Sequence, residues 1–229
     1  GLRFDAMNGI TGPYARHIFE DLLGAPPGTV IRGIPMPDFG GIHPDPAPAG
    51  MHELAAGMGS FRGPGLGAAC DGDGDRNLIM DRDGFVSPGD SVAVIAAHAA
   101  RCIPGYRKGL KGVARSMPTS TALDRVAADI GVACHETPTG WKYFGDLLDA
   151  GLCTLCGEES FGTGSDHIRE KDGIWAVLCW LSILAAGAGP RIAGILEEHW
   201  RRYGRSYYQR HDYEGLAVDA ATAMLEKLK

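Results

Sequence analysis

The sequence has little positive charge and no basic cluster. Its 22 lysines and arginines are outnumbered by 28 aspartates and glutamates, and the formal net charge is −6. A nucleic-acid-binding surface needs a local excess of lysine and arginine, because binding depends on neutralising phosphates and releasing their counterions. We therefore expect no nucleic-acid partner.

The chain also has no apolar run suited to a membrane. The run from Ile174 to Ala188 is interrupted only by Ser182 and Gly187, and it is shorter than the about 20 residues that a membrane span needs. We expect a buried core helix there and no membrane partner. No segment near the first residue resembles a signal peptide. Because the chain starts at Gly1 within a predicted strand and without an initiator methionine, we expect it to be part of a longer protein.

Paired cysteines of the kind that hold zinc are missing as well. Of the six cysteines, only Cys153 and Cys156 form a close pair, and no second pair lies at a useful spacing. On a strand, residues three apart face opposite sides, so these two thiols are not expected to chelate a metal. Buried free thiols are typical of a reducing compartment, and we expect a cytoplasmic protein.

The most informative stretch is Asp71-Gly72-Asp73-Gly74-Asp75-Arg76-Asn77. It follows an apolar run, residues 66–70, that predicts a short buried strand, and it leads into a second one at residues 78–80. The three carboxylates therefore lie at a strand end, where α/β proteins commonly place ligand sites. Carboxylate oxygens are hard ligands suited to Mg²⁺ or Ca²⁺. Asp71, Asp73 and Asp75 are our candidate metal ligands.

This stretch has two other interpretations. A solvated acidic turn is the simplest, but three neighbouring carboxylates repel one another unless a cation offsets them. A calcium-binding EF-hand would need Gly and Glu at its sixth and twelfth positions, which are Arg76 and Arg82 here. Arg76 beside a metal indicates instead an anionic ligand such as phosphate. A calcium-binding module of another kind stays open as an alternative.

Elsewhere, short apolar strands alternate with amphipathic helices, a pattern that predicts an α/β fold. The predicted strands are 2–6, 29–34, 66–70, 78–80, 85–86, 112–115, 132–134 and 152–156. The predicted helices begin at Thr11, Met51, Asp90, about Leu123, Trp141, Ile174 and Arg191, with one more near the C-terminus. The first of these should bury Tyr14, Ile18, Phe19 and Leu22 on one face.

Several segments resemble the phosphoglucomutases, the glucose 1,6-bisphosphate-dependent branch of the α-D-phosphohexomutase superfamily. They are residues 4–7, 71–77, 114–120, 136–142 and 156–173, the last of which reads Cys-Gly-Glu-Glu-Ser-Phe-Gly-Thr-Gly-Ser-Asp-His-Ile-Arg-Glu-Lys-Asp-Gly. The resemblance extends almost end to end, and this last motif is long enough to be highly specific.

The resemblance implies four domains around one cleft, of which this chain contains two consecutive α/β domains with mixed sheets covered by helices. Residues 1–104 correspond to the second domain, 105–205 to the third, and 206–229 to the start of the fourth. In the full protein, the first and fourth domains would be its partners, and the substrate would be a phosphorylated hexose.

The resemblance also implies roles for particular residues. Mg²⁺ would be the cofactor, held by the three aspartates, and glucose 1,6-bisphosphate would be the activator and intermediate. Arg76 and Lys171 would lie beside the transferring phosphoryl group. Glu158 and Ser160 would bind the sugar hydroxyls, while Thr139 and Gly140 would shape the cleft.

The chain departs from the family pattern in two ways. The serine- and arginine-bearing loop of the fourth domain, which the resemblance implies for the substrate's other phosphate, is absent. The phosphorylated serine of the family, in a Thr-Ala-Ser-His-Asn context, has no counterpart here. Ser116 and Ser120 do not lie in that context, and helix capping is the simpler role for them. We therefore expect the 229-residue chain alone to be inactive as a mutase. Phosphomannomutase and phosphoglucosamine mutase are alternatives, although their Gly-Glu-x-Ser-Gly-His loop is absent, and a non-catalytic scaffold relative is another.

Overall fold

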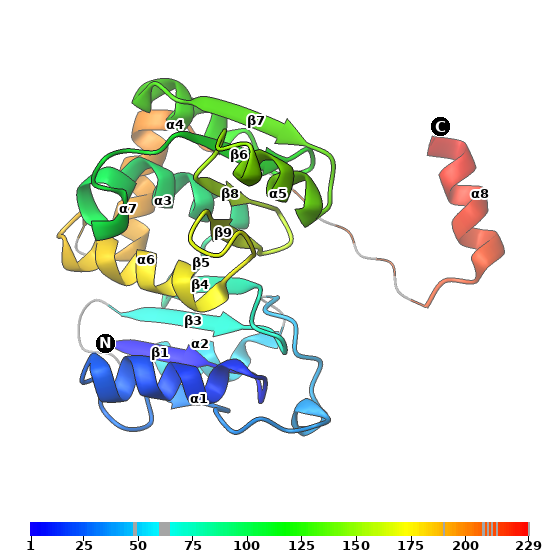
Figure 1. Ribbon diagram of the computed structural model, residues 1–229. Coiled ribbons are helices and arrows are strands. Elements are labelled where there is room, and N and C mark those ends of the chain that lie inside the picture. The colour runs from blue at the N-terminus through cyan, green and yellow to red at the C-terminus, as the bar shows by residue number, and fades with distance from the viewer. Residues whose placement is uncertain are drawn as a thin grey trace.

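A computed structural model describes residues 1–47, 50–59, 65–189, 191–207, 209, 211, 213 and 215–228. The chain forms two α/β units (Figure 1). The first unit contains a five-stranded sheet in the order β2-β1-β3-β4-β5. Its strands are β1 (Leu2–Asp5), β2 (Val30–Ile31), β3 (Leu66–Cys70), β4 (Asn77–Asp81) and β5 (Gly84–Phe85). β1 pairs in parallel with β2 and β3, whereas β4 is antiparallel to both β3 and β5, so the sheet is mixed as predicted.

The second unit contains a four-stranded sheet in the order β7-β6-β8-β9. Its strands are β6 (Gly112–Ser116), β7 (Ala133–Thr137), β8 (Leu155–Gly157) and β9 (Thr163–Ser165). β6 pairs in parallel with β7 and β8, and β9 closes the edge by an antiparallel pairing with β8. In both units, therefore, three parallel strands are followed by an antiparallel hairpin.

Helices cover the two sheets. They are α1 (Thr11–Ala15), which continues as the π-helical segment η1 (Arg16–Leu22), η2 (Phe39–Gly41), α2 (His52–Met58), α3 (Pro88–Cys102), η4 (Pro104–Tyr106), α4 (Ala122–Ile130), α5 (Trp141–Asp149), α6 (Gly173–Ala185), α7 (Ile192–Tyr203) and α8 (Val218–Leu228). α3 packs against α4, α6, α7 and β8. α8 lies apart from the rest of the chain in Figure 1 and has no buried residue. Within the described ranges, no helix combines the length and apolar character that crossing a membrane requires.

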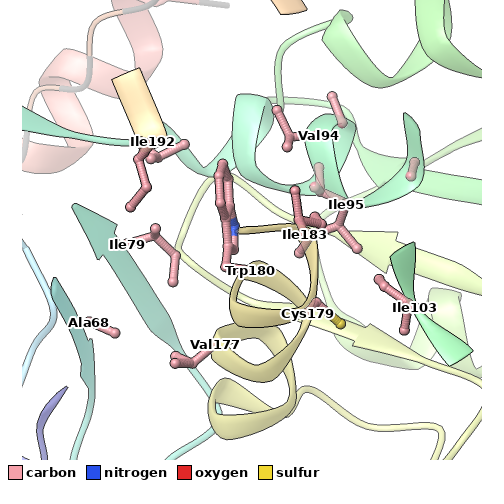
Figure 2. Packing of buried hydrophobic residues seen from close by; sticks show 14 of the residues in the cluster. Ala68, Ile79, Val94, Ile95, Ile103, Val177, Cys179, Trp180, Ile183 and Ile192 are labelled. Atoms are coloured by element: carbon pink, nitrogen blue, oxygen red, sulfur yellow. The ribbon is translucent and has the colours of Figure 1, made fainter. Parts of the chain in front are cut away.

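One hydrophobic core joins the two units through α6, which packs against β3 and β4 on one side and against α3 and β9 on the other. Figure 2 shows Trp180 of α6 between Ile79 of β4, Ile192 of α7 and the α3 residues Val94 and Ile95. The indole is fully buried, and its Nε1 donates to Ser91 Oγ at 2.9 Å. Replacing a buried residue of this size by alanine typically costs about 3–5 kcal/mol, so α6 is a major determinant of how the two units sit together.

Some predicted elements differ from the structure. In the first helix only Phe19 of the predicted apolar stripe is buried, while Tyr14 and Leu22 are exposed. The spacing changes from α-helical to π-helical at Arg16, and this rotates Leu22 away from the core, whereas Tyr14 lies before the change, in α1. The strand predicted over residues 29–34 contains only Val30 and Ile31. β9 was not predicted, because its residues are small and polar.

Candidate functional site

The acidic stretch forms the hairpin loop between β3 and β4, closed by the pairing of Cys70 with Asn77. Asp71, Asp73 and Asp75 each offer a carboxylate oxygen, and these atoms lie within 4.8 Å of one another. In the described part of the chain, this is the only group of three or more His, Cys, Asp or Glu side chains that meets this criterion. We call residues 71–76 the acidic loop.

The charges of the acidic loop are only partly compensated. Asp71 is almost completely buried, and burial raises its pKa to about 6 although Arg76 hydrogen-bonds to it. Asp73 is exposed and forms no ion pair with any residue that the structure describes, whereas Asp75 is half-buried. A divalent cation suits this arrangement, since three convergent hard oxygens would ligate it and its charge would relieve their repulsion.

Arg76 is held in place by two carboxylates. Its backbone N and its Nε donate to Asp71 at 3.0 and 2.8 Å, and its Nη1 donates to Asp45 Oδ1 at 2.7 Å. Within the described residues, Nη2 remains without a hydrogen bond. Asp45 was missed in the sequence, although its position between two prolines in His43-Pro44-Asp45-Pro46 marks a rigid loop.

Glu158 and Ser160 lie on the second hairpin loop, residues 158–162, which the pairing of Gly157 with Thr163 closes. We call these five residues the glutamate loop. The Glu158 side chain is buried, its backbone N donates to Gly162 O at 2.9 Å, and Ser160 is half-buried near the tip. Phe161 adopts a positive φ of 70°, a conformation that is uncommon for a bulky residue. The loop is therefore tightly constrained.

Hydrogen bonds join the acidic loop to the glutamate loop. Asn77 donates to Phe161 O from its backbone N at 2.9 Å and from Nδ2 at 3.1 Å. Next to this contact, Arg76 and Gly162 form an antiparallel β-bridge. The two units thus meet where both predicted binding motifs lie, which brings together residues that are more than 80 positions apart.

Lys171 lies between the two loops. Its Nζ is 2.7 Å from Asp75 Oδ2 and 3.4 Å from Glu158 Oε1. Burial disfavours the charged amine, but the hydrogen bond that it donates to Asp75 and the charge of Glu158 outweigh this effect and raise the pKa of Lys171. A Cβ on Gly162 would lie 2.5 Å from both Glu158 Oε1 and Lys171 Cδ, so only glycine allows these two side chains to meet here.

Thr139 and Gly140 lie at the start of α5, next to the site through Trp141. Thr139 is exposed, and Gly140 is the N-cap of α5. Trp141, the next residue, provides the connection: its Nε1 donates to Arg169 O at 3.3 Å, and its ring lies 5.9 Å from Lys171 Nζ. A role of Thr139 and Gly140 in shaping the cleft therefore stays a prediction.

A cavity of about 650 Å³ opens beside the acidic loop. Asp73, Asp75 and Lys171 line its polar end, and residues of α1 and α6, including Tyr14 and Trp175, line its apolar side. Glu170 and Asp172 also line it, so an anionic ligand would bind here only where a cation offsets the four carboxylates, while the apolar side would contact the body of the ligand.

Of the two serines outside the family context, Ser116 is buried and Ser120 is half-buried. Ser116 is fully buried and donates to Glu159 Oε2 at 3.0 Å. The capping role expected for them is wrong, because Thr121 is the N-cap of α4 and no side chain caps this helix. The cysteines are all free, as predicted. However, Cys153 precedes β8 and shares one apolar cluster with Cys156, so the two do not face opposite sides of a strand.

The fold and the site define a protein of two α/β units in which an acidic loop and a glutamate loop meet at the ends of paired strands. Comparison with known families agrees with this description. Residues 2–84 match domain II of the phosphoglucomutase/phosphomannomutase family, an alpha/beta/alpha domain, and residues 88–203 match alpha/beta/alpha domain III. The chain belongs to this family.

Individual relatives point to one branch. A phosphoglucomutase of Rhizobium radiobacter is 55% identical over 225 residues, which are 98% of this chain and 41% of that protein. A chloroplastic phosphoglucomutase of Arabidopsis thaliana is 53% identical, over 100% of this chain and 38% of its own length. The open-form crystal structure of parafusin, a phosphoglucomutase from Paramecium, superimposes with a TM-score of 0.88 at 52% identity, over 99% of this chain and 41% of that one.

These matches confirm the resemblance and the fold class predicted from the motifs. They also show that the chain spans about two-fifths of the length of the relatives it matches.

Proposed function

We propose that this chain is part of a phosphoglucomutase, an isomerase that interconverts glucose 1-phosphate and glucose 6-phosphate through a phosphoserine and glucose 1,6-bisphosphate. The observation that carries the proposal is the position of Lys171, which contacts Asp75 of the acidic loop and Glu158 of the glutamate loop. The Lys171 ammonium group thus links the acidic loop, which would bind the phosphate through its metal, to the glutamate loop, whose side chains would bind the sugar hydroxyls. The identity of 55% to a phosphoglucomutase supports this branch of the family.

Asp71, Asp73 and Asp75 would hold Mg²⁺. Among the described residues at this site, five carboxylates (these three with Asp45 and Glu158) surround two cations, Arg76 and Lys171, so the local charge favours a divalent ion. Bound there, Mg²⁺ would supply Lewis-acid polarisation and charge neutralisation to a phosphoryl group.

The protein's own residues would do the remaining work. Phosphoryl transfer depends mainly on alignment and on stabilising negative charge. Arg76 offers Nη2 for a phosphate oxygen while Asp71 and Asp45 hold the rest of its guanidinium. Lys171 places a second positive charge next to Asp75. The Glu158 carboxylate would accept hydrogen bonds from two neighbouring sugar hydroxyls, and the Ser160 hydroxyl would donate or accept beside it.

The chain would contribute the second and third domains, with residues 206–229 opening the fourth. In the full protein, the first domain would carry the serine nucleophile and the fourth would bind the other phosphate. The sequence placed the boundary between the two domains near residue 104. The packing of α3 against α4, α6 and β8 favours an earlier position, between β5 and α3.

We propose a cytoplasmic location for the full protein. A relative from Zea mays is a cytoplasmic phosphoglucomutase, whereas the relative from Arabidopsis is chloroplastic. Both kinds of location therefore occur among similar proteins.

The function is tested with the full-length protein in a coupled glucose 6-phosphate dehydrogenase assay, with glucose 1-phosphate, a trace of glucose 1,6-bisphosphate and Mg²⁺. We expect turnover that chelation of Mg²⁺ abolishes, and slower turnover with mannose 1-phosphate in a matched assay. Faster conversion of mannose 1-phosphate would favour the phosphomannomutase alternative, and no turnover of any hexose phosphate would favour a scaffold role. The 229-residue chain alone should be inactive.

A further inference from the structure

A second cavity, of about 400 Å³, lies between α3 and α7. Its polar lining is formed by His98 and Arg101 of α3 and by Glu198, His199, Arg202 and Tyr203 of α7. It shares no lining residue with the cavity beside the acidic loop. The proposed mutase reaction makes no use of it.

The histidine at the bottom of this cavity lacks a partner. His199 is 4% exposed, and neither of its ring nitrogens forms a hydrogen bond with any described residue. The ring packs against Tyr203 at a centroid distance of 4.9 Å, which fixes its plane. A buried ring with two unsatisfied nitrogens is costly, and such groups in native proteins usually have a bound partner.

The charges around the cavity are mainly positive. Arg101 contacts the cavity from α3, where its Nη2 lies 3.4 Å from His98 Nδ1. Glu198, which lines the cavity, is already paired with Arg201, and Asp129 is paired with Arg202. Burial, with the charges of Arg101 and Arg202, lowers the pKa of His98. Burial, with His98 and Arg125, lowers the pKa of His199 to about 4. A bound anion would attract these positively charged groups and would favour the protonated form of both histidines.

We propose that this cavity binds a small phosphate monoester, with its phosphate against Arg101, His98 and the N–H of His199. A phosphate offers several acceptor oxygens, which suits donors that approach from two helices. The apolar wall formed by Ala97, Ala188 and Ile195 would contact the organic part of the ligand. A carboxylate would satisfy fewer of these donors, and water alone would leave the positive charges uncompensated.

The proposal is tested by following the histidine ring signals in NMR spectra while the chain is titrated with glucose 6-phosphate and, separately, with inorganic phosphate. The Arg76→Gln variant serves as the background, because it weakens binding at the candidate catalytic site. We expect saturable shifts of the His98 and His199 signals, with tighter binding of the ester than of inorganic phosphate.

Two matched variants decide the assignment. Arg101→Gln removes an exposed guanidinium that lines the cavity, and Arg107→Gln removes an exposed guanidinium that does not. Losing one charged hydrogen-bond partner should weaken binding by about tenfold or more, so Arg101→Gln should bind weakly and Arg107→Gln normally. Absence of shifts at millimolar ligand, equal affinities of these two variants, or equal affinities for the ester and inorganic phosphate would each overturn the proposal. Because Arg101 is exposed, its variant should fold.

Discussion

The contact between α6 and the acidic loop leaves no space for a side chain at Gly173. A Cβ at this position would lie 2.5 Å from Cys70 Sγ, 2.6 Å from Arg76 O and 2.8 Å from Gly74 O. The backbone N of Gly173 also donates to Gly74 O at 3.0 Å. Gly173→Ala should therefore push the first turn of α6 away from the loop that holds the three aspartates.

The magnitude follows from two opposing effects. Overpacking a rigid contact typically costs about 1–3 kcal/mol, whereas replacing glycine by alanine in a helix stabilises it by roughly 0.5–1 kcal/mol. We expect Gly173→Ala to lower the free energy of unfolding by about 1–2 kcal/mol, since two of the three close atoms belong to the backbone and cannot rotate away. Affinity for Mg²⁺ should fall as well, because the acidic loop is displaced.

Gly145→Ala is the matched control. Gly145 lies inside α5, and a Cβ there meets no atom within 4 Å. This variant should be more stable than the parent by roughly 0.5–1 kcal/mol, with unchanged Mg²⁺ affinity. Urea unfolding and calorimetry on the three proteins measure both quantities. A Gly173→Ala protein as stable as Gly145→Ala would show that the contact between α6 and the acidic loop is not tight.

Three further predictions concern single side chains. Asp45→Asn in the full-length protein should reduce kcat/KM about tenfold because it weakens the hold on Arg76, and unchanged kinetics would argue that Asp71 alone is sufficient. Glu158→Ala should reduce kcat/KM for glucose 1-phosphate by about ten- to hundredfold but reduce it much less for substrates that lack the 3- or 4-hydroxyl; equal losses would mean that Glu158 does not bind the sugar. Burial lowers the pKa of His199 to about 4, so the folded state binds this proton more weakly than the unfolded state. Protonation of His199 therefore destabilises the folded state. The free energy of unfolding has its full value above pH 6.5, the ordinary pKa of histidine, and it decreases by up to about 3 kcal/mol as the pH falls from 6.5 to 4. Chemical denaturation in phosphate-free buffer should show this decrease in the parent and a smaller one in His199→Phe, whereas equal slopes would refute it.

The sequence predicted best those elements whose signal is local. β3 was predicted over the same five residues that the structure shows, because an apolar run ends abruptly at Asp71. α6 was predicted from its continuous apolar run, which has no polar face. The acidic loop was predicted because its three carboxylates are close together in the sequence itself. Such features need no information about the rest of the chain.

Features that depend on distant residues could not be predicted. Asp45 and Arg76 are 31 residues apart, and nothing in the sequence marks them as a pair. β9 forms only through its pairing with β8 and has the composition of a loop. The π-helical turn after Ala15 has no clear sequence signal, and it changed the buried face of the first helix. The place of Lys171 in the candidate site came from the family resemblance rather than from any local pattern.

The central claim is that the acidic loop holds Mg²⁺, and Asp73 is the best residue for testing it. Asp73 is exposed and takes part in no ion pair with Arg76 or Lys171, so Asp73→Asn removes a ligand without breaking these contacts. Asp219→Asn, on the exposed face of α8, is the control. Calorimetric titration with Mg²⁺ should show one site in the parent and in Asp219→Asn, and an affinity at least about tenfold lower in Asp73→Asn. Equal Mg²⁺ affinities of the three proteins, or no binding by the parent, would contradict the account.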